Sequence, residues 1–201
     1  RVDEELKNTE DLQKLGIEAG DFVSFDPRAN VTKNGFVKSR HLDDKASVAV
    51  LLDFARRVSE GKVTCSRKTY LFFSNYEEVG HGASAAMPDD SEEIISVDMG
   101  AVGDTLGTDE YVVSICAKDS GGPYDSTVVR SLIETAKRVG ADYSVDIYPF
   151  YGSDVEASLR AGYDVRFGLI GPGVEASHGY ERTHYKALEN TLKLIEGYIG
   201  N

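Results

Sequence analysis

The sequence has few cysteines, few basic residues and no long apolar run, and each shortage excludes a class of protein. Among its 201 residues are two cysteines, and 22 Lys and Arg stand against 34 Asp and Glu, for a formal net charge of −12. Cys65 and Cys116 share no motif, which indicates a reducing, cytoplasmic setting rather than a disulfide framework. The acidic surplus argues against a nucleic-acid-binding protein. No apolar run approaches the roughly 18 residues that a membrane span needs.

The remaining features are typical of a folded α/β protein. An apolar share of 41% and a charged share of 28% are ordinary for globular proteins and argue against wholesale disorder. The first 40 residues indicate strands and loops without a convincing long helix: residues 21–25 have a short strand pattern, and Pro27 and Gly35 separate it from the rest of the chain.

After residue 40, helix and strand patterns alternate to the end. Apolar residues at every fourth position predict a helix over 43–58 that ends near Gly61. Further helices are expected over 126–139, 153–161 and 185–199. Strands are expected over 69–73, 93–97, 111–117, 144–148 and 165–170. The alternation predicts an α/β class fold, a mostly parallel sheet flanked by helices, in which ligands bind beyond the carboxyl ends of the strands.

Three groups of acidic residues occupy such positions. Asp43 and Asp44 open the first helix, Glu77 and Glu78 follow the strand expected at 69–73, and Asp98 ends the strand at 93–97. Each has a purely structural reading, as a helix N-cap, a solvated loop or a turn residue. In the functional reading they bind metal ions, and one Glu acts as a general base that takes a proton from water.

Histidine is the other candidate ligand. The four histidines are His41, His81, His178 and His184. A lone histidine is more often structural or exposed than a ligand. Taken together, however, three carboxylate positions and one histidine have the composition of a two-metal, zinc-type site with a bridging Asp and an unligated Glu base.

In their order and spacing, these motifs resemble one known family. The segments are Leu42-Asp43-Asp44-Lys45, Glu77-Glu78-Val79-Gly80, Val97-Asp98-Met99-Gly100, Gly152-Ser153-Asp154 and Ser177-His178. They resemble the motifs of the tetrahedral-type dinuclear metallo-aminopeptidases, the glutamyl/leucyl aminopeptidase family, some of whose members have been labelled endoglucanases. The resemblance covers essentially the whole chain and corresponds to the C-terminal part of the family's sequence.

The resemblance implies a zinc-peptidase-like three-layer sandwich that holds two divalent ions, zinc or cobalt. The implied metal ligands are Asp43, which bridges both ions, Glu78 and His178 on one ion, and Asp98 on the other. Glu77 is implied as the general base, and Gly152, Ser153 and Asp154 as the substrate-binding turn. The family's wider group also implies a cis peptide between Asp43 and Asp44. His184, Glu181 and Arg182 are expected to have structural roles or to orient His178.

One ligand of the family has no clear counterpart here. The family carries its remaining histidine in a His-x-Asp motif upstream of a β-rich insert domain. Residues 1–39 resemble the tail of that insert, a dimerisation-type domain, and residues 40–201 resemble the catalytic α/β domain without its first strands. His41 and Asp43 form a His-x-Asp string, but His41 aligns with a variable position. Loss of one ligand would weaken metal binding and leave the isolated chain inactive.

The resemblance therefore implies a metal-dependent aminopeptidase that hydrolyses N-terminal residues of peptides. A related dinuclear deacylase or carboxypeptidase is one alternative. The other is a catalytically incomplete fragment or scaffold subunit, which the gathered carboxylates oppose because their mutual repulsion costs stability without a cation. The expected partners are peptide substrates and further copies of the chain, with no nucleic acid and no membrane. The preferred N-terminal residue is left open.

Overall fold

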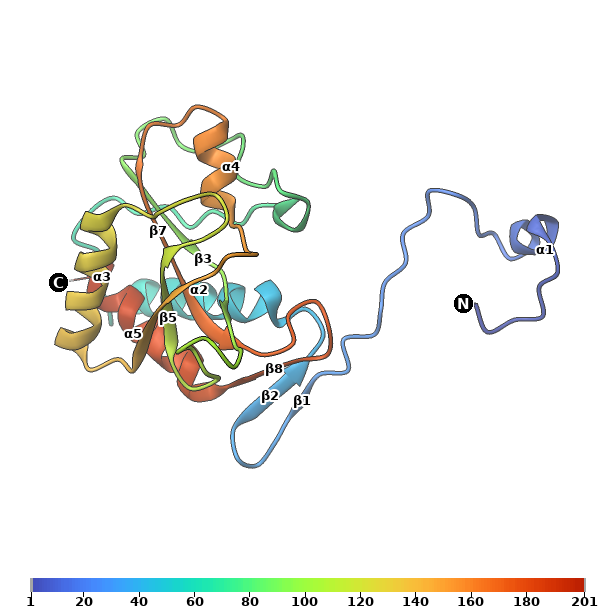
Figure 1. Cartoon of the computed structure of the whole chain (residues 1–201), viewed down its shortest axis with the longest axis horizontal. Helices are drawn as coiled ribbons and strands as arrows, with labels where there is room; N and C mark the ends of the chain where they lie inside the picture. The colour runs from blue at the N-terminus through green and yellow to red at the C-terminus, as the bar shows by residue number, and fades with distance from the viewer. Residues whose placement is uncertain (1, 201) are drawn as a thin grey trace.

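A five-stranded sheet forms the centre of the molecule in a computed structural model, which describes residues 2–200 (Figure 1). The order across the sheet is β3 (Glu93–Val97), β7 (Arg166–Val174), β5 (Val113–Lys118) and β6 (Tyr143–Ile147), and β4 (Gly100–Ala101) also pairs with β7. The pairs β3–β7, β4–β7 and β5–β6 are parallel, and β5–β7 is antiparallel. The expected mostly parallel sheet is confirmed.

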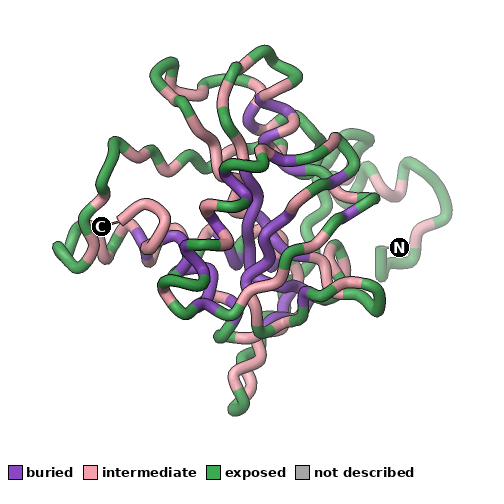
Figure 2. The backbone as a smooth tube through the Cα atoms, turned by 60° about the vertical axis from the view of Figure 1, so that its left-hand side comes forward, coloured by how far each residue is buried: buried purple, intermediate pink, exposed green. Residues whose placement is uncertain are grey.

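The helices expected after residue 40 all form. They are α2 (Leu42–Ser59), α3 (Ser126–Val139), α4 (Asp154–Arg160) and α5 (Tyr185–Ile199). α5 packs against both α2 and α3 and against β7, whereas α4 contacts β3 and β7 and lies away from α2 and α5 (Figure 1). The buried part of the backbone lies at the centre of the molecule (Figure 2). Phe54, Ile115 and Leu132 are among the fully buried side chains.

A second, three-stranded antiparallel sheet lies beside the first. It consists of β1 (Asn30–Val31), β2 (Phe36–Ser39) and β8 (Glu181–His184). The sequence patterns miss β8 because it is short and consists of polar residues. Its alternation is nevertheless that of a strand: Glu181 and Thr183 are buried, and the residues between and after them are half-exposed. This pairing places the end of the first 39 residues directly against the segment that carries His178.

The strand expected at 21–25 is wrong. Residues 2–26 form an extended arm that projects from the body, with the short helix α1 (Thr9–Lys14) near its far end (Figure 1). Within the described residues, the arm segment 21–25 pairs with no other strand, and the Phe22 side chain is fully exposed. Its alternating apolar pattern has no neighbour with which to form a ladder.

The strand expected at 69–73 is also wrong. The segment is extended, but within residues 2–200 it belongs to neither sheet, and the side chains of Tyr70, Phe72 and Phe73 are exposed. An apolar run predicts a buried strand only if strands are present to flank it.

No helix among residues 2–200 combines the length and the apolar character that crossing a bilayer requires.

Candidate metal and catalytic site

The first candidate ligand lies at an irregular helix start. α2 begins after His41, which has a left-handed backbone (φ 65°) and makes no side-chain cap. Asp43 and Asp44 have non-helical dihedral angles, and the peptide between them is cis, as the resemblance implies. The Asp43 carboxylate does not cap the helix: it accepts a hydrogen bond from Ser177 Oγ at 2.7 Å. This start turns Asp43 towards the loop between β7 and β8.

Three candidate metal ligands from separate parts of the chain meet at this point. Donor atoms of Asp43, Glu78 and His178 all lie within 4.8 Å of one another. His178 Nε2 is 2.9 Å from Glu78 Oε2 and 3.3 Å from Asp43 Oδ2. The donors come from the start of α2, the short 3₁₀ helix η1 (Glu77–Val79) and the loop before β8. The structure thus brings together three of the four expected ligands.

Residues with a left-handed backbone conformation position two of these donor side chains. Tyr76, before η1, has φ 64°, and His178 itself has φ 64°. Non-glycine residues adopt this region rarely, and surrounding contacts must hold them there. For His178 the contact is explicit, because its backbone N–H donates to Glu181 Oε1 at 2.9 Å.

Glu181 links two of the candidate ligands. Its side chain is 1% exposed, and its second oxygen accepts the backbone N–H of Asp43 at 3.1 Å. Glu181 therefore contacts His178 through its backbone N–H group rather than its imidazole ring, and the expected orienting role stays a prediction. Arg182 does not take part: its guanidinium pairs with Glu110 at 2.6 Å and lies over the Phe36 ring.

Asp98, the fourth expected ligand, lies at the end of β3. It is buried, and its Oδ1 accepts the backbone N–H of Met99 at 2.8 Å. Burial raises the pKa of Asp98 well above its usual range, and the negative charges of Asp44 and Asp43 raise it further. Asp98 is outside the three-donor group but lines the same cleft as Asp43. A cation in this cleft would offset the cost of keeping both carboxylates ionised.

Glu77, the expected general base, is half-buried beside the ligands. Burial is the largest cause that raises its pKa to about 7, and the carboxylates of Asp154, Glu78 and Asp43 add to the effect. A carboxylate with this pKa exchanges protons readily at neutral pH.

These residues line a cleft of about 710 Å³. Gly152 and Ser153 of the expected substrate-binding turn also line it, and Phe150 at its mouth is fully exposed. Asp154, the third residue of that turn, is not among the residues that line the cleft. Its carboxylate accepts hydrogen bonds from Ser74 Oγ and from the Ala83 backbone N–H. Asp154 therefore ties α4 to the loop that carries η1.

The other histidines stay outside the three-donor group. His184 caps α5, because its Nδ1 accepts the Lys186 backbone N–H at 3.1 Å, in agreement with a structural role. His81 stacks on the Tyr76 ring, with centroids 5.0 Å apart. His41 is exposed.

The fold and the three converging donors define an α/β domain with a candidate metal-binding cleft. The TET1 peptidase of Pyrococcus horikoshii superposes with a TM-score of 0.80 at 22% identity, over 96% of this chain and 58% of that one. Aminopeptidase APDkam598 of Desulfurococcus kamchatkensis gives 0.79 at 20% identity, over 98% and 57%. At these identities the likeness establishes the fold.

Sequence comparison then assigns the family: the model of the M42 glutamyl aminopeptidase family matches residues 1–194, and the chain belongs to that family. YhfE of Bacillus subtilis (strain 168), an aminopeptidase by name, is 48% identical over 199 residues. The match covers 99% of this chain but 58% of YhfE, so the chain spans little more than half the length of these relatives.

Proposed function

We propose that the chain is the catalytic part of a metal-dependent aminopeptidase that removes N-terminal residues from peptides. The observation that carries the proposal is the convergence of Asp43, Glu78 and His178 in a member of the M42 family. The name and 48% identity of YhfE support the same activity. Because the chain spans 58% of YhfE, the activity of the whole protein is part of this proposal.

The donors present fit zinc or cobalt. One imidazole nitrogen and two carboxylate oxygens within 4.8 Å of one another suit a borderline divalent cation. Glu78 and His178 would hold one ion and Asp98 a second, and Asp43 would contribute to holding both. The burial of Asp98 in the same cleft supports the second assignment.

Divalent ions, when bound, polarise a peptide carbonyl and make water more acidic. The chain's own contribution is a positioned base. Glu77 lines the cleft with the ligands, and its pKa of about 7 suits it to take the proton of the attacking water and pass it to the leaving amine. Asp154, which anchors Ser74 and Ala83, holds the loop in place for this transfer.

The charge of the cleft favours a free amine over a free carboxylate. Its acidic lining residues are Asp43, Glu77, Glu78, Asp98 and Glu156. Arg160 also lines it, but its guanidinium pairs with Glu156 at 3.1 Å. A carboxypeptidase or related deacylase usually needs an unpaired basic group for the terminal carboxylate of its substrate, whereas a peptide's α-ammonium suits these acids. Gly152 and Ser153 are proposed to border the bound N-terminal residue.

We place a further metal ligand outside these 201 residues, because the family's His-x-Asp histidine has no counterpart in the three-donor group. We also propose a cytoplasmic homo-oligomer in which residues 1–39 belong to a dimerisation-type domain. The assembly of Pyrococcus horikoshii TET1 peptidase into a tetrahedron or an octahedral shell supports this proposal.

Metal content tests the site directly. After loading with zinc or cobalt and desalting, elemental mass spectrometry should find metal bound to the chain, and His178→Ala should lower the affinity of one ion by at least about tenfold. His41→Ala is the matched control and should change nothing. Two ions per chain would indicate a complete site, and one ion a half-site that needs the rest of the fold. Failure to retain any ion, alone or with the rest of an M42 chain, would contradict the proposal.

Activity is measured with peptides that differ at one end. A metal-loaded, complete protein should hydrolyse a peptide with a free N-terminus and leave the N-acetylated peptide intact. Equal hydrolysis of both, or release of C-terminal residues, would assign the site to a deacylase or a carboxypeptidase.

A further inference from the structure

The extended arm joins the body of the molecule through residues 25–28, which form the arm root (Figure 1). The Pro27 carbonyl accepts the Arg40 N–H at 2.8 Å and the Ser39 hydroxyl at 3.1 Å. Arg28 has a left-handed backbone (φ 50°), a conformation in which surrounding contacts must hold a residue other than glycine. The arm root is therefore fixed on the body rather than freely hinged.

The first side-chain contact of the arm root reaches the segment that carries Asp43. The Arg40 guanidinium lies over the Phe25 ring, 4.9 Å from its centroid. Arg40 Nε is buried and, within residues 2–200, has no hydrogen-bond partner. The negative face of an aromatic ring attracts a cation, so Phe25 stabilises the position of the Arg40 side chain. Arg40 precedes Asp43 by three residues.

The second side-chain contact reaches the loop that carries His178. Tyr180 Oη donates to the Arg28 carbonyl at 3.0 Å, across 152 residues of sequence. The Arg28 guanidinium also lies over the Tyr180 ring, 5.5 Å from its centroid. Tyr180 follows His178 by two residues. The arm root therefore contacts the chain next to this candidate ligand.

The backbone of the His178 loop depends on such contacts. Ala176 and His178 both have left-handed angles, with φ 58° and φ 64°. The loop is closed at its base by Glu175 and Arg182, whose backbone groups bond each other at 2.8 and 3.1 Å. Between these two residues, Tyr180 makes the contact that ties the loop to the arm root. Loss of this contact would allow the loop to relax towards less strained angles.

The two segments that the arm root contacts also meet at the candidate metal site. Glu181 accepts the backbone N–H of His178 at 2.9 Å and that of Asp43 at 3.1 Å. The arm root adds a second connection between the same segments, through Phe25 on one and Arg28 on the other. Asp43 and His178 are thus linked twice, once beside the site and once through the arm root.

We propose that the arm root positions Asp43 and His178 for metal binding, with Tyr180 and Phe25 as the positioning residues. Tyr180 holds the His178 loop, and Phe25 holds the start of α2 through Arg40. Both positioning side chains lie outside the lining of the cleft, so they act through the backbone of the ligand segments. The inference rests on the proposed metal site and extends it to residues of the arm.

Amide hydrogen exchange on the metal-free full chain gives the first test. In Tyr180→Phe, which keeps the ring and loses the hydrogen bond to the arm root, the His178 amide should exchange at least about threefold faster. The Arg182 amide at the base of the loop should not change. Phe22→Ala is the matched control, because it removes a fully exposed ring elsewhere on the arm. An unchanged His178 amide in Tyr180→Phe, or the same increase in Phe22→Ala, would overturn the proposal.

Metal affinity, measured by titration against a competing chelator, gives the second test. Tyr180→Ala removes both contacts with the arm root and should weaken the binding of one zinc or cobalt ion by about tenfold. Tyr180→Phe and Phe25→Ala each remove one contact and should weaken it by about threefold. The absorption bands of bound cobalt should also shift in Tyr180→Ala, because they depend on the arrangement of the ligands. Phe22→Ala should match the unmodified protein in affinity and in spectrum.

The outcomes separate this inference from the proposed function. If the unmodified protein retains no ion, even when complete, both are contradicted. If it binds metal and Tyr180→Ala shows the same affinity and the same cobalt bands, the arm root only attaches the arm to the body, and the inference alone fails. A general loss of stability is recognised in the metal-free chain: the midpoint of thermal unfolding of Tyr180→Phe should stay within about 2 °C of that of the unmodified chain. Weaker metal binding that appears only in variants with a larger decrease would also overturn the positioning role.

Discussion

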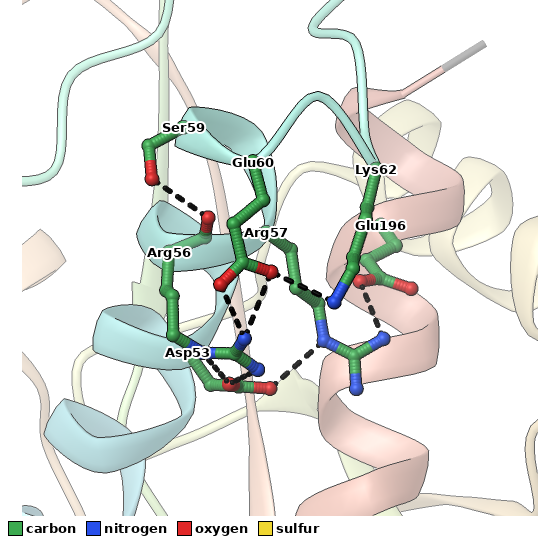
Figure 3. Close-up of polar contacts among 7 residues, drawn as sticks. All are labelled: Asp53, Arg56, Arg57, Ser59, Glu60, Lys62 and Glu196. Carbon is green, nitrogen blue, oxygen red and sulfur yellow. Dashed lines mark hydrogen bonds and ion pairs between the residues drawn. The ribbon is translucent and has the colours of Figure 1, made fainter.

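The two ends of helix α2 carry charged clusters of opposite character. At the C-terminal end, acids and bases alternate and pair (Figure 3). Arg56 bonds Asp53 at 2.6 Å and Glu60 at 2.8 Å, and Lys62 pairs with Glu60 at 2.7 Å. Arg57 pairs with Asp53 and reaches Glu196 of α5 at 3.3 Å. Every carboxylate in this cluster has a basic partner from the chain itself.

At the N-terminal end, carboxylates gather with little basic compensation. The acids are Asp43, Asp44, Glu77, Glu78 and Asp98, and within the described residues His178 is the basic group paired with them. Burial and mutual repulsion raise the pKa of Glu77, Glu78 and Asp98. The charges at the C-terminal end of α2 stabilise the fold. The charges at the N-terminal end lower its stability as long as no cation is bound.

The sharpest test of this contrast replaces one carboxylate of each charged cluster with an amide. Glu77→Gln should lower hydrolysis by the metal-loaded, complete protein by about 10²- to 10⁴-fold, because it removes the proton acceptor. Its metal content should stay unchanged, since Glu77 is not among the three converging donors. Peptide hydrolysis rates and elemental analysis measure the two effects.

The control is Glu60→Gln, which loses a carboxylate at the C-terminal end of α2, outside the cleft. Hydrolysis by this variant should stay close to that of the unmodified protein. A comparable loss of hydrolysis in both variants would mean that the loss comes from lower stability of the protein. It would exclude Glu77 as the general base.

Glu181→Gln tests whether a buried carboxylate near the site supports the ligands rather than the chemistry. An amide group in place of the carboxylate turns an NH₂ towards one of the backbone N–H groups of Asp43 and His178, which both need an acceptor. The free energy of unfolding should fall by about 1–3 kcal/mol. Urea unfolding measures it.

The same Glu181→Gln variant should bind metal more weakly, because Asp43 and His178 lose their common anchor. Glu175→Gln is the control, since Glu175 pairs with Arg182 at the surface. If Glu181→Gln leaves both stability and metal affinity unchanged, the anchoring role is excluded.

Acidity should change the stability of the metal-free chain in an unusual direction. The pKa of Glu77 is about 7 in the folded state against a usual value of 4.5, so between these values the folded chain binds more protons than the unfolded chain. Stability therefore decreases as pH rises through this window. The midpoint of thermal unfolding should be a few degrees higher at about pH 5.5 than at about pH 8.

Zinc should remove or reverse that pH dependence, because a bound cation favours the ionised carboxylates. Glu77→Gln should reduce it in the metal-free chain. A metal-free chain that becomes more stable between about pH 5.5 and about pH 8 would mean that the N-terminal cluster carries no net electrostatic strain.

Local patterns in the sequence predict the helices and most central strands because those patterns depend on neighbouring residues. α2, α3 and α5 follow from apolar spacing, and β3 and β7 from short apolar runs. The segments 21–25 and 69–73 carry equally strong patterns, yet neither forms a strand. A strand requires a partner, and the partner is a property of the whole chain that no local pattern contains.

Part of the candidate site can likewise be predicted from the sequence, and part of it cannot. The positions of the acidic residues, together with the family resemblance that selects His178, predict that Asp43, Glu78 and His178 converge. The anchoring contacts of Glu181 depend on the pairing of β8 with β2, and the direction of Asp154 depends on Ser74, 80 residues away in sequence. Such contacts follow from tertiary structure and leave no periodic signal.

The smallest effect is expected at the balanced end of α2. Asp53→Asn removes the acceptor shared by Arg56 and Arg57, but these groups are solvent-exposed, and exposed ion pairs contribute little to stability. The midpoint of thermal unfolding should fall by at most about 2 °C at low salt, and by less in about 1 M salt, which screens the pairs. Metal content should not change. A loss larger than that of Glu181→Gln would reverse the comparison, because it would place the main electrostatic stabilisation of α2 in the paired surface cluster rather than at its N-terminal end.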